Sequence, residues 1–89
     1  MNLYASREDY LEAILVLYKK FGSVRSVDIA RHMGVSKPSV CHAVNVLCDG
    51  GFLTKDDKHF ISLTEEGRKV AEKIYERHKF FKEQLISAE

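Results

Sequence analysis

The chain has 89 residues, 45% of them hydrophobic, and a formal net charge of +1. This length allows one domain with a modest core and leaves little room for an enclosed active site, and the small charge does not by itself indicate a nucleic-acid partner. No run approaches the roughly 20 apolar residues of a membrane span, and residues 1–9 lack the apolar core of a signal peptide. We therefore expect a cytoplasmic protein. We also expect that it is not an enzyme, because no catalytic triad spacing or glycine-rich phosphate loop occurs.

The first predicted helix begins after Ser6 and runs to about Phe21. Ser6 and Asp9 have nearly the spacing and chemistry of a capping box, and Gly22 can end the helix. Apolar residues recur at helical spacing and are expected to face the core. They are Tyr10, Leu11, Ile14, Leu17, Tyr18 and Phe21.

Residues 26–51 have the pattern of two short amphipathic helices joined by a turn at Gly34. Ser26 can cap the first of these helices and Ser36 the second, where Pro38 fits the first turn because its missing N–H costs nothing there. The expected inward residues are Val27, Ile29, Ala30 and Met33, then Val40, Ala43, Val44 and Leu47, with Val35 filling the corner. This is a helix-turn-helix pattern, which indicates DNA binding.

The remaining residues predict a hairpin and a long helix. Gly50 and Gly51 can end the preceding helix, and the β-prone runs 52–55 and 59–63 flank a charged turn. Thr64 can cap a helix that continues toward the C-terminus. We therefore predict a mainly α fold with a small β-hairpin: a winged helix-turn-helix over 1–64, then a long helix over 65–89.

The outer face of the second helix-turn-helix helix carries the candidate DNA contacts. Asparagine can pair with adenine and lysine can donate to guanine in the major groove, whereas the simpler interpretation is an ordinary solvated helix face. The predicted contacts near the bases are Ser36, Lys37, Pro38, Ser39, Cys41, His42 and Asn45. Candidate phosphate contacts are Arg25, Arg31, Lys55 and Lys58.

Two cysteines occur, Cys41 and Cys48, seven residues apart on one predicted helix. They should lie roughly 10 Å apart, which exceeds the reach of a disulfide, so we expect two thiols. Cys48 is close to the apolar stripe and is expected to be a small buried hydrophobe, whereas Cys41 is expected to be more exposed.

Asp9, Glu12 and His78 form a second candidate group. If the first and last helices pack together, two carboxylates and one imidazole could converge on one cation, and this ligand set suits manganese or ferrous iron better than copper. Taken by themselves, the residues favour a simpler explanation, in which Asp9 belongs to a helix cap and His78 is a hydrogen-bonded core histidine.

Several segments together resemble the diphtheria-toxin-repressor family, especially its manganese-responsive branch. They are the runs SREDYLEAI at 6–14, SKPSV at 36–40, LTEEG at 63–67 and Arg77-His78, and the resemblance spans nearly the whole chain. It implies a homodimeric, metal-activated transcriptional repressor in which metal binding sets the spacing of two winged helices on a palindromic operator. It also implies that residues 65–89 are a linker helix that leads toward a dimerisation domain absent from this chain. It also implies that Asp9, Glu12 and His78 bind Mn(II) or Fe(II), with Asp9 favouring Mn(II), and that residues 36–45 form the recognition helix.

The resemblance leaves the metal site incomplete, because the family's remaining Glu/Glu/His ligands lie on a further helix and this chain ends at Glu89. Lys82 also stands where several relatives have a carboxylate, which argues against an accessory metal. We expect the N-terminal part of a longer repressor of metal-uptake genes, in which other segments cover Phe80, Phe81, Leu85 and Ile86. The alternative is a metal-independent winged-helix module that binds DNA or another protein.

Overall fold

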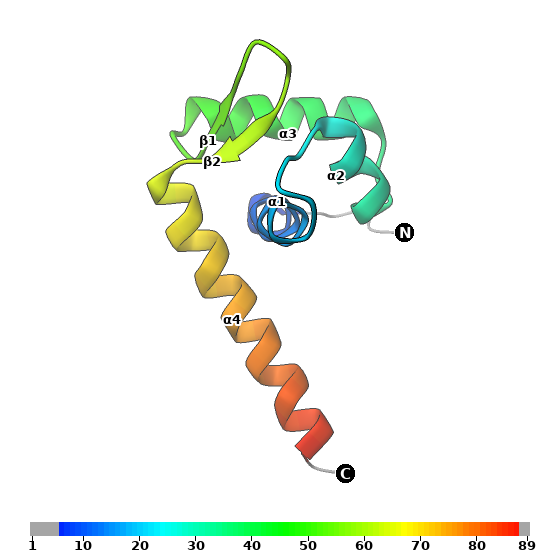
Figure 1. Cartoon of the computed structure of the whole chain (residues 1–89), viewed down its shortest axis with the longest axis vertical. Helices are drawn as coiled ribbons and strands as arrows, with labels where there is room; N and C mark the ends of the chain where they lie inside the picture. Colours follow the sequence, from blue (N-terminus) through cyan, green and yellow to red (C-terminus); the bar gives the residue numbers. More distant parts are fainter. Residues whose placement is uncertain (1–5, 88–89) are drawn as a thin grey trace.

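The computed structural model describes the backbone of residues 6–87 and the side chains of residues 6–78. The described residues form α1 (Arg7–Phe21), α2 (Ser26–Met33), α3 (Lys37–Asp49), β1 (Leu53–Lys55), β2 (Ile61–Leu63) and α4 (Glu65–Ser87). This order confirms the predicted winged helix-turn-helix followed by a long helix (Figure 1). Within residues 6–87, no helix has the length and apolar character needed to cross a membrane.

Helix α1 is the centre of the fold and packs against α2, α3, β2 and α4. Figure 1 shows it end-on, with the helix-turn-helix on one side and α4 on another. Its N-terminus has the predicted capping box: the Asp9 N–H donates to Ser6 Oγ at 3.2 Å, and the Ser6 N–H donates to Asp9 Oδ2 at 2.9 Å. At its C-terminus, Gly22 adopts φ 80°, a conformation that glycine reaches at little cost.

The prediction that Tyr18, Phe21 and Val27 face the core is wrong, since these side chains are 53%, 65% and 45% exposed. Helical spacing predicts which face of a helix is buried, but it does not show how far along the helix the neighbouring elements cover that face. Conversely, α1 has neighbours on several sides, so Ala13 and Leu15 are buried outside the predicted stripe.

The helix-turn-helix follows the sequence prediction except at its first cap. The N-cap of α2 is Arg25 and not Ser26, because the Arg25 N–H donates to Asp28 Oδ2 at 3.0 Å. Gly34 ends α2 with φ 70°, and Ser36 caps α3 by accepting the Ser39 N–H at 3.3 Å. The inner face of α3 is buried as predicted, through Val40, Val44 and Leu47.

The wing is a two-stranded antiparallel hairpin that pairs Leu53 with Leu63. Its strands are shorter than predicted because the turn has its own hydrogen bonds: Asp56 Oδ1 accepts the N–H groups of Lys58 and Phe60, each at 2.9 Å. His59 adopts φ 68°, outside the extended region, and so cannot continue a strand.

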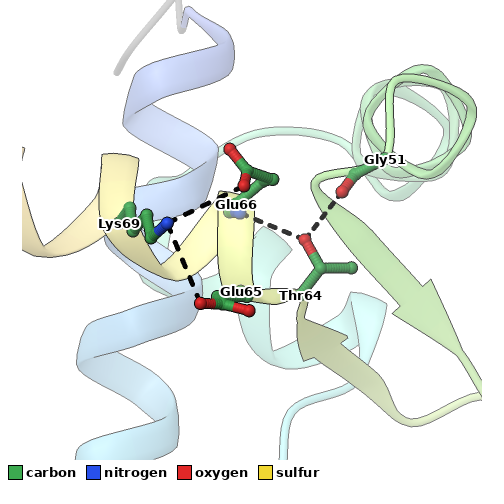
Figure 2. A network of polar contacts seen from close by, with 6 residues as sticks. Gly51, Thr64, Glu65, Glu66 and Lys69 are labelled. Carbon is green, nitrogen blue, oxygen red and sulfur yellow. Dashed lines mark hydrogen bonds and ion pairs between the residues drawn. The ribbon is translucent and has the colours of Figure 1, made fainter.

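The junction between wing and α4 depends on Thr64 (Figure 2). Its hydroxyl donates to the Gly51 carbonyl at 2.7 Å and accepts the Gly67 N–H at 3.1 Å, so one side chain both caps α4 and ties it to the end of α3. Glu65 and Glu66 occupy the first turn, where their charge complements the helix dipole, and both lie near Lys69 Nζ, at 3.8 and 3.9 Å.

Thr64→Ala is expected to lower the free energy of unfolding by about 1–2 kcal/mol, because it removes a helix cap and leaves the Gly51 carbonyl without its donor. Chemical denaturation followed by circular dichroism measures this loss. Thr64→Ser keeps the hydroxyl and is expected to retain most of the stability. Equal stability of the alanine and serine variants would show that these hydrogen bonds contribute nothing.

Helix α4 packs against α1, and its N-terminal half carries the buried residues Ala71 and Ile74. Its C-terminal end extends away from the other elements, and the molecule has a longest dimension of 47 Å (Figure 1). The predictions for the side chains of Phe80, Phe81, Lys82, Leu85 and Ile86 lie outside the described side chains.

Candidate DNA-binding face and metal cleft

Most of the predicted base contacts of α3 are exposed, whereas Cys41 is half-buried. Lys37, Pro38, His42 and Asn45 are exposed. Ser36 and Ser39 are also exposed, but their hydroxyl oxygens are 2.8 Å apart and take part in the start of the helix. The outer face of α3 therefore presents one cation, one imidazole and one amide to solvent, within a short rigid segment.

Exposed basic residues lie on the wing and at α2, the two neighbours of α3 in the helix-turn-helix and hairpin. Lys55 and Lys58 are exposed on the wing, which packs against α3 through β1, and Arg31 is exposed on α2. Arg25 is exposed at the start of α2, and its guanidinium carbon lies 4.2 Å from the centroid of the Phe60 ring in the wing. Four exposed positive groups thus lie on elements next to α3, although the net charge of the chain is only +1.

Both cysteines are free thiols, as predicted. Cys48 packs partly buried against the hydrophobic core. Cys41 is half-buried as well, so the two thiols fall in the same range of exposure. Seven positions make almost two full helical turns, so both cysteines lie on the same side of α3, beside its buried stripe.

An open cleft of about 460 Å³ contains the predicted metal ligands. Its walls come from α1, α2 and α4: Asp9, Glu12, Ala13, Val16, His32, Met33 and His78. At the centre of the polar part, Glu12 Oε2 and His78 Nδ1 lie 2.7 Å apart and share a hydrogen bond across 66 positions of sequence. The side chains of Glu12 and His78 are 21% and 51% exposed, so the pair is accessible from solvent.

Asp9 lines this cleft and is also part of the N-terminal cap of α1. It lines the same cavity as Glu12 and His78, but its Oδ2 accepts the Ser6 N–H, so the simpler capping explanation holds for the geometry seen here. In the part of the chain with described side chains, no three His, Cys, Asp or Glu groups converge closely enough to hold a metal ion. His78 is hydrogen-bonded, as the simpler explanation requires, but it is exposed and does not belong to the core.

His32 is a cleft residue that the sequence analysis did not identify. It comes from α2, whose sequence pattern places it on the outer face of a short helix, and nothing in its spacing relates it to Asp9 or Glu12. The packing of α2 on α1 brings its side chain to the wall of the same cleft. The position of His32 at the cleft follows from the angle between α1 and α2, which the sequence does not show.

Comparison with known proteins identifies the family. The iron-dependent repressor N-terminal DNA-binding domain matches residues 2–59. The chain belongs to the iron-dependent repressor family. Over 79 residues it is 35% identical to the transcriptional regulator MntR of Salmonella typhimurium, covering 89% of this chain and 50% of that protein. Over 80 residues it is 32% identical to MntR of Geobacillus kaustophilus, covering 90% and 57%.

A solved structure agrees with these sequence relatives. The crystal structure of T. acidophilum IdeR superposes with a TM-score of 0.66 at 35% identity, over 74% of this chain and 31% of that one. The chain spans about half the length of the curated relatives it matches. These comparisons confirm the family resemblance and the winged-helix fold, and they identify residues 2–59 as the N-terminal DNA-binding domain of an iron-dependent repressor.

Proposed function

We propose that this chain is the operator-binding part of a transcriptional repressor of metal-uptake genes, controlled by Mn(II) or Fe(II) and acting in the cytoplasm. The observation that carries the proposal is the pairing of Glu12 on α1 with His78 on α4, in a cleft that Asp9 also lines. Residues 1–64 read the DNA, and residues 65–89 lead toward a dimerisation domain. Two copies bind a palindromic operator.

The DNA-reading part of the proposal uses α3 as the recognition helix. Its exposed face enters the major groove, where Asn45 pairs with adenine and Lys37 donates to guanine. Pro38 and the β-carbon of Ser39 pack against a thymine methyl, and Cys41 and His42 lie along the same groove. Lys55, Lys58, Arg25 and Arg31 contact phosphates and fix the register.

The chemistry of the cleft fits the proposed metal. Carboxylate oxygens with one imidazole nitrogen suit Mn(II) and Fe(II), and neither cysteine lines the cleft, so no thiolate favours zinc or copper. Glu12 and His78 would hold the cation, and Asp9 would join them by exchanging its hydrogen bond with Ser6 for a metal bond. The cation would supply positive charge that neutralises these carboxylates and joins α1 to α4. Similarity to MntR proteins and the carboxylate at position 9 support Mn(II) over Fe(II).

The joining of α1 to α4 explains how metal could control DNA binding. Helix α4 extends out of the winged helix, so a small change in its angle at α1 moves the far end by a larger distance. In a dimer held together through the segments beyond α4, that angle sets the separation of the two α3 helices. Recognition of two half-sites depends on a separation of about one DNA turn, near 34 Å.

A titration of this chain with fluorescent duplex DNA from its own upstream region tests the proposal. The affinity is measured with and without Mn(II), and with Fe(II) under anaerobic conditions, at one fixed salt concentration. Metal-enhanced binding that is lost in Glu12→Gln supports the proposal. Binding that is equally tight with and without metal in both proteins supports a metal-independent winged-helix module, which the capping role of Asp9 favours.

Asn45→Ala is expected to weaken binding to the preferred duplex by about 1–3 kcal/mol, because one bidentate base contact is lost. Binding to a scrambled duplex should change much less. Lys73→Ala, an exposed change on α4, is the control and should leave both affinities unaltered. An equal loss on both duplexes would mean that Asn45 does not read a base.

A further inference from the structure

Arg25 lies where the start of α2 meets the wing. Its guanidinium carbon is 4.2 Å from the Phe60 ring centroid, which is the geometry of a cation–π stack. Beside it, the Ile61 N–H donates to the Val24 carbonyl at 2.7 Å. This backbone bond joins the base of the wing to the segment before α2. Because Ile61 follows Phe60 and Val24 precedes Arg25, the bond holds the backbones of Arg25 and Phe60 close together.

The Phe60 ring is on a constrained part of the hairpin. The Phe60 N–H donates to Asp56 Oδ1 at 2.9 Å, and the Phe60 carbonyl accepts the Asp56 N–H at 3.0 Å. The next residue, Ile61, is 1% exposed and anchors the strand in the core. A half-buried ring held in this way offers a defined surface to a partner side chain.

Stacking uses the face of the guanidinium and leaves its edges for hydrogen bonding. The five N–H donors of arginine lie in the plane of the group, so a stacked arginine can still donate to two oxygens of one phosphate. Among the side chains that the structure describes, no carboxylate forms an ion pair with Arg25. Asp28 accepts the backbone N–H of Arg25, so the acid caps α2 while the guanidinium extends from it.

We propose that Phe60 is a positioning residue for DNA binding, which holds the Arg25 guanidinium flat so that its edge meets a backbone phosphate beside the groove that α3 enters. This inference rests on the proposed phosphate contact of Arg25. Unlike the exposed Lys55 and Lys58, Arg25 is ordered before DNA arrives, and it therefore loses less side-chain freedom on binding. The ligand is the phosphodiester backbone of double-stranded DNA, independent of its sequence.

The test is a double-mutant cycle on the full chain, with fluorescence anisotropy of a short duplex of arbitrary sequence over a series of salt concentrations. Arg25→Ala is expected to weaken binding about tenfold. The negative slope of log affinity against log salt should become shallower by about 0.9, the value for one phosphate contact. Phe60→Leu is expected to cost about threefold, and Phe60→Tyr, which keeps an aromatic face, should restore most of it. The double variant Arg25→Ala/Phe60→Leu should bind no more weakly than Arg25→Ala alone.

Matched controls separate positioning from general damage. Phe21→Leu removes an exposed ring at the end of α1, and Arg68→Ala removes an arginine that pairs with Glu72 on α4, and both should bind duplex like the parent chain. Arg25→Lys keeps the charge without the flat stack and is expected to lose about threefold. This variant decides the question even if Phe60→Leu does not fold, as judged by circular dichroism.

The outcomes separate the two hypotheses. Unchanged affinity and salt slope in Arg25→Ala would reject the phosphate contact itself, and with it the inference. A tenfold loss of affinity in Arg25→Ala would support the phosphate contact. The positioning role of Phe60 would then be rejected if Arg25→Lys kept the full affinity of the parent chain. It would also be rejected if the losses of affinity in Arg25→Ala and Phe60→Leu multiplied in the double variant.

Discussion

Gly67→Ala is expected to lower the free energy of unfolding by about 3 kcal/mol, the upper part of the range for overpacked sites. A β-carbon at position 67 would overlap the Phe52 carbonyl oxygen and lie 2.9 Å from its carbonyl carbon. Both atoms are backbone, and the Phe52 oxygen also accepts the Thr64 N–H at 3.1 Å, so it cannot move aside without breaking the junction of wing and α4. Guanidinium denaturation followed by circular dichroism measures the effect.

Gly50→Ala is the matched control for this prediction. Gly50 has φ −78°, which any residue adopts. Its β-carbon would lie 3.2 and 3.3 Å from two carbons of the Phe52 ring and 3.5 Å from the Val46 carbonyl oxygen, and the last of these is an ordinary contact. The ring edge can shift by a few tenths of an ångström, so we expect a change within about 1 kcal/mol. If both variants unfold at the same denaturant concentration, the close approach of α4 to Phe52 does not limit stability.

His78→Ala is expected to weaken Mn(II) binding by roughly tenfold to a hundredfold or more, because it removes the only nitrogen among the three predicted ligands. Glu12→Gln should have a similar effect, since it removes the charge at the other end of the 2.7 Å contact. Binding is followed by the electron paramagnetic resonance signal of free Mn(II) during titration. Thermal unfolding with and without Mn(II) gives a second readout, because a bound ion stabilises the folded state.

Two other histidine variants sharpen this measurement. His42→Ala changes an exposed histidine of α3 that does not line the cleft, and it should leave Mn(II) affinity unaltered. His32→Ala changes the cleft histidine on α2 and shows whether a fourth side chain takes part. Equal Mn(II) binding by the parent chain, His78→Ala and His42→Ala would contradict the proposed metal site and favour the metal-independent module.

Local signals predicted the helix boundaries well because each depends on a few neighbouring residues. The capping box of Ser6 and Asp9, the left-handed Gly22 and Gly34, and the hydroxyl caps at Ser36 and Thr64 are all short-range chemistry. The prediction of Ser26 as the cap of α2 was wrong although serine is a preferred capping residue. The carboxylate of Asp28 accepts the N–H of Arg25, so the helix begins one residue earlier, with Arg25 as the N-cap.

Burial was less predictable, as Tyr18 and Phe21 show. Both continue the apolar spacing of α1, yet they are exposed, while Leu15 lies off that stripe and is 3% exposed. Periodicity assumes one buried face along the whole helix. A central helix with neighbours on several sides does not meet that assumption.

The sequence by itself determined the order of elements, most of the helix caps, the position of the helix-turn-helix and the family resemblance, because these depend on residue type and spacing within short segments. Only the tertiary structure decided which distant residues meet: Glu12 with His78, His32 in their cleft, Arg25 on Phe60, and Gly67 against Phe52. It also showed Asp9 bound to its own cap and not joined with Glu12 and His78. Such meetings depend on the angles at which helices pack, which are set jointly by many side chains and by no single local pattern.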